Sequence, residues 1–402
     1  MSIIRDITIK AKKYLETDEV LLIVGSRQAG KTTILRQLRE DLDNQKKNTF
    51  FLNLEEMEYL GLLNESPRNL FKIFTLDLNQ KNYVFIDEIQ YLKNPSNFLK
   101  FIFDEYQGKI KLIVSGSSAF YIDKKFKDSL AGRKKIFHVT TLSFREFLRF
   151  KQVEKLAHLD FSKLSLTDKE KISVYFGEYV IFGGYPKVVL SVLGEKKEIL
   201  QEIAFSYIKK DVYEANIKQE ETFYKLFKIL ASQAGNLLNA SELAKTLGVS
   251  KTTIDNFLYV MQKSFHIVLI RPFYKNMRKE LTRMPKVYFA DLGLRNFFMN
   301  DFGGFEQRGD KGILLENIVF RQLSDKFEGD EIKFWRTIGK HEIDFIVDEK
   351  NALEVKVDSE RLRVKNYKIF QENYPKIDFS VVTLNKKNNA VNDIKILDAW
   401  EL

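Results

Sequence analysis

The stretch Gly25-Ser-Arg-Gln-Ala-Gly-Lys-Thr32 is the most informative part of the sequence, because its spacing and its flanks predict one local structure. It directly follows the short apolar run Val20 to Val24, which is typical of a buried parallel strand. It directly precedes a helical pattern that places Ile34, Leu35 and Leu38 on one face. The spacing G-x-x-x-x-G-K-[ST] between a strand and a helix predicts a phosphate-binding loop. A chance match in a chain of this length has a frequency of about 1–2%.

The backbone and two side chains of this loop form the predicted nucleotide site. The glycines allow the backbone to curve so that its N–H groups point at phosphate oxygens, and the following helix adds partial positive charge. Lys31 is expected to reach the β- and γ-phosphates, and the Thr32 hydroxyl is expected to bind Mg²⁺. The predicted ATP-binding residues are Gly25, Ser26, Arg27, Gln28, Ala29, Gly30, Lys31, Thr32 and Thr33, with Ser115 from a later strand.

A second motif, Tyr83-Val-Phe-Ile-Asp-Glu-Ile89, is an apolar strand that ends in two acids. A carboxylate at the tip of a buried strand is costly unless it meets a cation. Asp87 is therefore predicted to bind Mg²⁺, directly or through water. Glu88 is predicted to orient or polarise the attacking water, as a catalytic residue beside Lys31. Glu88 also favours hydrolysis over phosphoryl transfer to a small molecule, so the two motifs together predict a magnesium-dependent ATPase.

The next predicted strand ends in Val114-Ser-Gly-Ser-Ser118, where a polar side chain would lie beside the γ-phosphate. Ser115 and Ser117 are both candidates for a residue that senses this phosphate. A serine-rich turn without such a role is the alternative for each of them.

Composition narrows the class of protein. The chain has 402 residues, which predicts two to four domains, and its net charge of +10 fits either a polyanionic partner or scattered surface lysines. The absence of cysteine excludes disulfides, cysteine–zinc sites and thiol catalysis. The charged segment from Met1 to Thr17 lacks an apolar secretory core, and the longest apolar runs are strand-sized. We therefore expect a cytoplasmic protein without a membrane anchor.

The succession of strand and helix patterns predicts an α/β fold with four parts. Residues 1–150 alternate strands with helices, as in a parallel sheet that helices cover on both faces. The expected parts are a P-loop ATPase domain at 1–150, a helical lid or connector at 151–235, a helix-turn-helix unit at 236–290 and an α/β domain at 291–402. Strands of the first part are expected at 20–24, 49–54, 83–86 and 110–114.

Residues 239–261 have the rhythm of a helix-turn-helix. Ser241 is expected to cap the first helix, Gly248 to supply the left-handed turn residue and Ser250 to cap the second helix. The residues expected to face inward are Leu243, Ala244, Leu247, Ile254, Phe257 and Leu258. Those expected to face outward, toward phosphates or base edges, are Lys251, Thr252, Asp255 and Asn256.

A strand-like run from Phe265 to Arg271 leads into a basic segment that we interpret as the wing of a winged helix. Its cations are Lys275, Arg278, Lys279, Arg283 and Lys286, around the single acid Glu280. This concentration of positive charge favours DNA as a partner. The alternative is that the unit docks a protein or acts as a lid, as winged helices also do.

Two strand-like runs between residues 343 and 357 alternate so that their charged side chains avoid the apolar face. A short connecting loop would place Asp344 opposite Glu354, with Lys356 two residues along on the same face. Two carboxylates and a lysine can bind Mg²⁺ and activate water for attack on a phosphodiester, and Glu316 on the preceding helix is a third acid. Asp344, Glu354 and Lys356 are thus candidate catalytic residues, and Glu316, Asp344 and Glu354 are candidate metal ligands. A hairpin with one solvated polar face is the alternative.

Five stretches carry a family resemblance, namely Gly25 to Thr33, Phe85 to Gln90, Val114 to Ala119, Leu130-Ala-Gly-Arg133 and Leu142-Ser-Phe-Arg-Glu-Phe147. They resemble the archaeal-type AAA ATPase family, in which a domain of unknown function related to PD-(D/E)XK nucleases follows the ATPase. The acidic and lysine spacing described above also resembles the PD-(D/E)XK motif, with Ile343 in place of its proline. The resemblance covers about residues 18 to 360 and implies an AAA+ core, a winged helix and a restriction-endonuclease-like end.

This resemblance also bears on a residue outside the two nucleotide motifs. It makes Arg133 a candidate arginine finger or sensor, because a guanidinium can offset charge in the transition state. A surface arginine is the alternative. Sites of the AAA type often form between subunits, so the resemblance implies a homo-oligomer by analogy. Ser26 stands where the family often has proline, at a position that contributes only backbone.

Two functions from different classes follow. The first is an ATP-binding, magnesium-dependent ATPase whose nucleotide state controls a DNA-engaging C-terminal half, with nuclease activity left open. The second is a nucleotide-gated binding protein whose winged helix and nuclease-like end engage protein or DNA without cleavage. A small-molecule kinase is disfavoured by the length of the chain and by Glu88.

Overall fold

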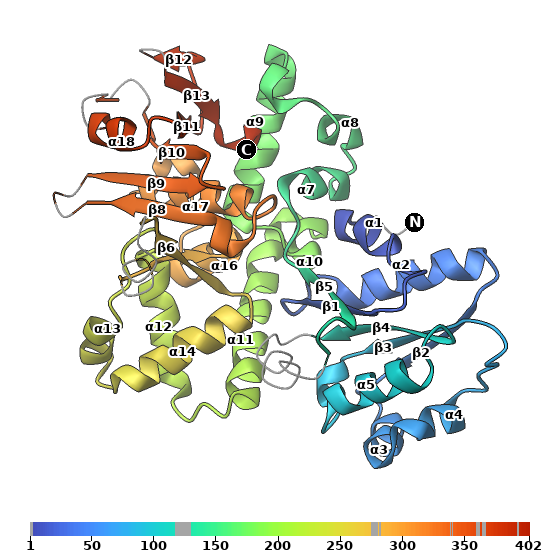
Figure 1. Cartoon of the computed structure of the whole chain (residues 1–402). Helices are drawn as coiled ribbons and strands as arrows, with labels where there is room; N and C mark the ends of the chain where they lie inside the picture. Colours follow the sequence, from blue (N-terminus) through green and yellow to red (C-terminus); the bar gives the residue numbers. More distant parts are fainter. Residues whose placement is uncertain are drawn as a thin grey trace. The chain divides into compact units, whose positions relative to one another are not determined.

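The structure is a computed structural model, drawn in Figure 1, in which the chain forms two compact units. One unit comprises Met1–Thr141 and Lys263–Phe265, and the other comprises Leu142–Gln262 and His266–Leu402. The structure describes residues 3–116, 130–274, 280, 283–337, 339, 341–358, 362–363, 367–391 and 394–402, without the side chains of residues 207, 208 and 211.

The first unit is built on a parallel sheet of five strands in the order β2-β3-β4-β1-β5. The strands are β1 Val20–Gly25, β2 Asn48–Asn53, β3 Asn82–Asp87, β4 Ile110–Gly116 and β5 Lys134–Val139. The four strands predicted from the sequence are confirmed, and so is the parallel α/β sheet. Because all the strands run in one direction, their carboxyl ends meet at one edge of the sheet, which is where the predicted nucleotide residues lie.

Helices cover both faces of this sheet (Figure 1). Leu21 and Ile23 of β1 pack with α1 Asp6–Lys12 and α2 Lys31–Asn44. The alternate residues Leu22 and Val24 face the other way, because successive side chains of a strand point to opposite faces. That second face packs against α3 Met57–Glu65, α4 Leu70–Ile73 and α5 Pro95–Glu105.

Strand β5 was not predicted from the sequence. It begins with Lys134 and Lys135, and its exposed and buried residues alternate, because it is an edge strand that pairs on one side with β1. The continuous apolar run that identifies a central parallel strand is therefore missing.

The second unit begins with helices, as the sequence predicts. They are α7 Phe144–Phe150, α8 Glu154–Ala157, α9 Leu166–Phe182, α10 Pro186–Leu190, α11 Lys196–Glu214, α12 Glu220–Ser232, α13 Ala240–Leu247 and α14 Lys251–Lys263. Two further helices, α16 Leu292–Met299 and α17 Lys311–Leu323, precede the C-terminal strands, and α18 Lys368–Asn373 lies among them. In the part of the chain that the structure describes, none of the helices is long and apolar enough to cross a membrane.

A mixed sheet of eight strands forms the rest of this unit, in the order β12-β13-β11-β10-β9-β8-β6-β7. The strands are β6 Ile267–Pro272, β7 Lys286–Phe289, β8 Ile332–Arg336, β9 Glu342–Val347, β10 Asn351–Val355, β11 Asp378–Thr383, β12 Ala390–Val391 and β13 Ile394–Asp398. The antiparallel pair β6 and β7 joins this sheet through β8, which β6 meets in parallel register.

A large hydrophobic core joins distant segments of this second unit. Phe176 and Tyr179 of α9 belong to the same cluster as Leu314 and Ile318 of α17 and as Trp400 near the C-terminus. The rings of Phe176 and Trp400 meet edge to face, with centroids 5.5 Å apart. The division of residues 142–402 at 235 and 290 thus stays a prediction, because the core of the unit crosses both boundaries.

Candidate functional site

The loop between β1 and α2 has the backbone of a phosphate-binding loop. Gly30 has a φ of 95° and Gln28 a φ of 53°, so the chain turns through left-handed conformations just before Lys31 begins the helix. Gly25 is required for a different reason, because a Cβ built there would lie 2.0 Å from the carbonyl oxygen of Val139 on β5. Ser26, Arg27 and Ala29 are buried, whereas Gln28 and Thr33 are exposed.

Two cations support this loop. The Lys31 ammonium is buried and donates hydrogen bonds to the carbonyl oxygens of Gly25 and Ser26, at 3.2 and 2.9 Å. Arg5, just before α1, donates to the carbonyl oxygen of Ala29 at 2.7 Å and also bonds the segment after β5. This role of Arg5 was not predicted, because Arg5 lies 24 residues before Ala29 and no local pattern in the sequence indicates the contact.

The acid of the second motif and the hydroxyl of the loop meet directly. Thr32 Oγ1 donates to Asp87 Oδ2 at 2.7 Å, and Ser115 Oγ donates to the other oxygen, Oδ1. Asp87 is 3% exposed and Ser115 is fully buried. The structure therefore brings the loop, the tip of β3 and the end of β4 to one point. Of the two serine candidates, Ser115 lies at this point, and Ser117 lies outside the described residues.

The oxygens gathered here fit a magnesium ion. Mg²⁺ takes hard oxygen ligands and is usually held by one or two carboxylates together with substrate phosphates. The Thr32 hydroxyl and the Asp87 carboxylate supply such oxygens at the start of a helix whose backbone N–H groups suit phosphate. Without a cation, Asp87 would be a buried acid that the hydroxyl groups of Thr32 and Ser115 stabilise by hydrogen bonds.

Glu88 stands beside this group in an uncommon backbone conformation. Its φ is 59°, in the left-handed region that residues other than glycine seldom occupy. Its N–H donates to Ser115 Oγ at 3.1 Å, and its carboxylate accepts a hydrogen bond from the Gln90 side chain. Such local strain often accompanies functional sites, because the surrounding structure must hold it in place.

Arg133 lies away from the nucleotide residues of its own chain. Its carbonyl bonds the N–H of Val20 at the start of β1, whereas the loop follows the end of that strand. The length of β1, about 16 Å, separates the two positions. The Arg133 guanidinium pairs with Asp104 at 2.9 Å. Arg133 is therefore too far from the loop to sense the nucleotide bound to its own chain. A finger role would need a second copy of the chain.

The predicted C-terminal acids lie in a cluster that includes a lysine predicted elsewhere. Lys286 on β7 is 2% exposed, and its Nζ lies 2.9 Å from Glu316 Oε1 and 2.6 Å from Glu342 Oε1. Asp344 Oδ1 lies 3.6 Å from the same ammonium. The Tyr288 hydroxyl donates to Glu316 Oε1 at 2.5 Å.

The other half of the cluster joins β9 to β10. The pairing of β9 with β10 ends with Leu353 opposite Phe345, one residue before the two acids Glu354 and Asp344. Asp344 Oδ2 accepts a bond from the N–H of Val355 at 2.8 Å. Glu354 Oε1 accepts bonds from Lys356 at 2.5 Å and from the Tyr367 hydroxyl at 3.1 Å. Glu354 Oε2 is buried and has no hydrogen-bond partner among the described residues.

Burial perturbs two of these acids. It raises the pKa of Glu316 to about 7, with a further rise from Asp344 and an opposing effect of Lys286. It raises the pKa of Glu354 to about 8, again with a contribution from Asp344, while Lys356 acts in the opposite direction. Burial also raises the pKa of the Tyr288 hydroxyl, so that it stays a donor to Glu316.

The three predicted metal ligands Glu316, Asp344 and Glu354 do not fit a three-acid magnesium site. Within the described ranges, no three acidic or histidine side chains are grouped so that they could hold a metal ion. Glu316 instead faces the Lys286 ammonium, and Glu354 faces Lys356. The prediction that Lys286 is a surface cation of the wing is wrong, because it lies on a strand whose residues are all buried.

The two helices of the predicted helix-turn-helix are present as α13 and α14 (Figure 1). Asn239, and not Ser241, caps α13, through bonds from the N–H groups of Ser241 and Glu242. Gly248 ends α13 with a φ of 69°, and Ser250 caps α14 through the N–H of Thr253, both as predicted.

The inward and outward faces of these helices largely follow the prediction. Leu247 is only half-buried, whereas the other residues expected to face inward are buried. The residues expected to face outward, namely Lys251, Thr252, Asp255 and Asn256, are exposed. Of the predicted wing cations, Arg283 is exposed, and Lys275, Arg278 and Lys279 lie outside the described residues.

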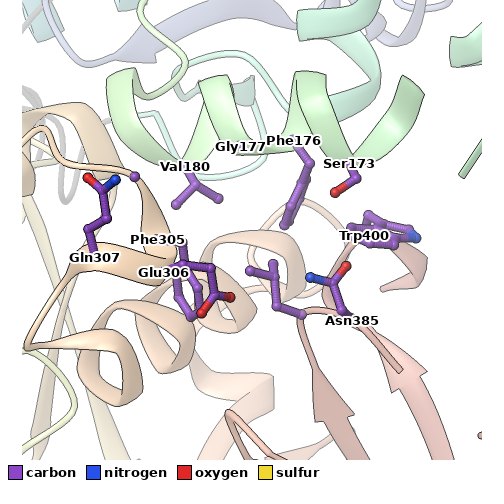
Figure 2. Close-up of a pocket in the computed structure, with 11 residues that line it drawn as sticks. Ser173, Phe176, Gly177, Val180, Phe305, Glu306, Gln307, Asn385 and Trp400 are labelled. Atoms are coloured by element: carbon purple, nitrogen blue, oxygen red, sulfur yellow. The ribbon is translucent and has the colours of Figure 1, made fainter. Parts of the chain in front are cut away.

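A cavity of about 280 Å³ lies between α9 and three later segments of the second unit (Figure 2). Figure 2 shows the Phe176 and Val180 side chains of α9 directed into it, opposite Phe305. The sequence carries no signal for this hollow, because its walls come from segments far apart in the chain. It is lined by Ser173, Phe176, Gly177, Val180, Gly304, Phe305, Glu306, Gln307, Leu384, Asn385 and Trp400.

Three segments of the chain match known families. Residues 17–148 match the family described as an AAA domain. Residues 174–303 match a domain of unknown function, DUF8612, and residues 311–402 match another, DUF4143.

Relatives that align over most of this chain occur in several organisms, and their descriptions assign no activity. An uncharacterized protein of Methanocaldococcus jannaschii is 29% identical over 354 residues, which cover 85% of this chain and 74% of the relative. An uncharacterized protein of Haemophilus influenzae is 27% identical over 77% of this chain and 76% of its own length.

A comparison with solved structures adds the ORC2 protein of Aeropyrum pernix in its ADP form. It is 13% identical, with coverage of 76% of this chain and 96% of that chain and a TM-score of 0.37. A likeness at this score supports no conclusion about fold or function. The sequence match and the geometry of the first unit nevertheless agree: the chain has an AAA-type ATPase domain at its N-terminus, followed by two domains of unknown function.

Proposed function

We propose that this chain binds ATP with Mg²⁺ and hydrolyses it, and that the nucleotide state controls a C-terminal half that engages DNA. The single observation that carries the hydrolysis is the meeting of Thr32, Asp87 and Ser115, from three separate elements, beside Lys31. Such a convergence of a hydroxyl, a buried acid and a phosphate loop is the arrangement that P-loop ATPases use.

Each residue has a distinct task in this proposal. The loop N–H groups and Lys31 bind the phosphates and orient the γ-phosphate. Thr32 and Asp87 would hold Mg²⁺, which supplies positive charge to the phosphate oxygens when bound. Glu88 orients the attacking water and withdraws its proton, while Ser115, bonded to both Asp87 and Glu88, positions the two acids.

Contact with DNA is supported by the exposed face of α14. Lys251, Thr252 and Asn256 lie together there with the side chains that phosphates and base edges require. Arg283 adds an exposed cation after β6. The proposed engagement does not include cleavage, because Glu316 and Asp344 face Lys286.

A protein partner in place of DNA is the second candidate. The observation that favours it is that acids pair with some of the cations that the sequence assigned to DNA binding. Lys286 is buried against acids, and Lys251 pairs with Asp255 at 2.6 Å, so two of the predicted cations are partly or fully neutralised.

The test is an assay of ATP hydrolysis by the whole chain with Mg²⁺, with and without duplex DNA, followed by inspection of the DNA. We expect turnover that depends on Mg²⁺, that is lost in Lys31→Ala and that changes when DNA is added, while the DNA stays intact. Absence of turnover in folded protein would contradict the ATPase proposal. Turnover that DNA does not change, together with no DNA binding, would favour a protein partner.

A further inference from the structure

Lys286 lies in an unusual environment for a lysine. It is on β7, 2% of its surface is exposed, and its ammonium contacts Glu316 on α17 and Glu342 on β9, with Asp344 of β9 at 3.6 Å. A charged group is seldom buried to this extent unless it is paired and hydrogen-bonded. Here three carboxylates from two elements surround one ammonium.

The ammonium takes the place that a divalent ion would need. Glu316, Asp344 and Glu354 were predicted to share a metal ion, and Lys286 Nζ lies 2.9 and 3.6 Å from oxygens of the first two. A magnesium ion at this point would require ligand oxygens at about 2.0–2.1 Å. It would also meet the ammonium at close range, where like charges repel strongly in a buried environment.

Glu316 has little freedom to turn toward a metal elsewhere. A Cβ at Gly235 would lie 2.9 Å from Glu316 Cδ, so the carboxylate fills the space next to the Gly235 backbone that a side chain would need. Gly235 is held by a bond from its N–H to the carbonyl oxygen of Val287 at 2.8 Å. The Tyr288 hydroxyl fixes the same Glu316 oxygen that Lys286 binds. Glu316 is therefore clamped from three sides in its contact with Lys286.

We propose that Lys286 is the resident cation of the Glu316, Glu342 and Asp344 cluster, in place of a divalent metal ion. The cluster then joins β7, α17 and β9 as a fixed ion-pair network that works without metal and does not cleave phosphodiesters. The first residue of β7, next to the segment that connects β7 to β6, is thereby joined to α17 and β9. This inference is independent of the proposed ATPase reaction.

The first test uses wild-type protein without nucleotide and Mn²⁺ alone as the probe. Mn²⁺ is titrated calorimetrically into wild type, Asp87→Asn and Asp344→Asn. We expect Asp344→Asn to bind as much Mn²⁺ as wild type. Any binding that Asp87→Asn removes belongs to the nucleotide site. A stoichiometric Mn²⁺ site that is lost in Asp344→Asn and kept in Asp87→Asn overturns the proposal, as does Mn²⁺-dependent DNA cutting that Asp344→Asn abolishes.

The second test removes the cation. Lys286→Met leaves buried acids without a partner, so the melting temperature of the unit should fall by about 10 °C. The control Lys333→Met removes a lysine of β8 that is paired with Glu280 at 2.9 Å outside the cluster, and it should change the melting temperature much less. The double variant Lys286→Met/Glu316→Gln should recover at least half of the loss.

The double variant also decides the case in which Lys286→Met does not fold. A folded double variant supports the proposal, because removal of one acid then compensates for the missing cation. A Lys286→Met protein as stable as wild type would contradict it. A double variant no more stable than Lys286→Met would also contradict it, because the unpaired charge of Glu316 would then not be the cause of the lost stability.

Discussion

Gly25 and Gly30, which the loop motif treats alike, are needed for different physical reasons. Gly30 has a φ of 95°, and a Cβ there would meet open space, so only backbone strain of about 1–2 kcal/mol opposes a side chain. Gly25 has no such conformation, but a Cβ there would overlap the backbone of Val139. At the residue scale, one glycine shapes the loop and the other allows β5 to pack beside it.

Gly25→Ala is expected to destabilise the first unit. The methyl group must push β1 and β5 apart, which should lower the free energy of unfolding by about 3 kcal/mol. The control is Gly61→Ala on α3, where a Cβ meets nothing within 4 Å, and this change should raise stability by about 0.8 kcal/mol because alanine favours helix. Calorimetric melting of both variants measures the effects. Equal melting temperatures for the two would contradict the role assigned to β5.

Glu88→Gln is expected to separate ATP binding from hydrolysis. The amide cannot take up a proton from water, so turnover should fall by about 100-fold or more, while affinity for ATP with Mg²⁺ stays within a few-fold. Glu105→Gln, an exposed acid of α5, is the matched control and should leave both unchanged. Nucleotide titration and steady-state turnover give the two readouts. Full activity of Glu88→Gln would remove Glu88 from the mechanism.

At the element scale, α13 and α14 show how local rules place a pair of helices. Asn239 takes the cap of α13 because asparagine at this position accepts bonds from two N–H groups, and this moves the helix start two residues before the predicted Ser241 cap. Gly248 and Ser250 occupy the positions that turn and cap chemistry require. The exposed face of α14 follows from these local signals alone.

Lys251→Ala is expected to weaken binding of duplex DNA by several-fold and to lower the slope of log affinity against log salt by about 0.9. Lys225→Ala is a close control, because both lysines are 59% exposed and each pairs with an acid four residues away. Fluorescence anisotropy at several salt concentrations measures both quantities. If the two variants bind DNA equally well, α14 does not contact its backbone.

At the scale of the whole molecule, the buried acids of the second unit link its stability to pH. The folded pKa of Glu354, about 8, lies above the ordinary value of 4.5, so folded protein keeps a proton that unfolded protein has released. The unfolded state therefore binds fewer protons between these values, and this contribution to stability falls as pH rises from about 4.5 to 8. Glu316, with a pKa of about 7, acts in the same direction.

Glu354→Gln is expected to gain in relative stability with increasing pH. Near pH 5 the wild-type carboxyl is protonated and resembles the amide, so the two proteins should melt at similar temperatures. Near pH 8 the folded wild type either carries a buried negative charge or keeps a proton that the unfolded chain has released, and both lower its stability. The variant should therefore melt at the higher temperature. Glu372→Gln, at an exposed glutamate of α18, controls for surface charge. A difference that does not grow with pH would show that Glu354 is ionised throughout.

The nucleotide loop, its acidic partner strand and the helix pair α13 and α14 could be predicted from the sequence alone. Strand, loop and helix are contiguous there, so backbone conformation and caps depend on near neighbours in the chain. The burial of Lys286 could not be predicted in this way, because the basic segment around it indicated a surface cation. Its partners are 30, 56 and 58 residues away, at Glu316, Glu342 and Asp344, and burial among them depends on how β7, α17 and β9 pack. Spacing along a chain specifies local geometry, whereas the environment of a charge is set by whichever distant elements enclose it.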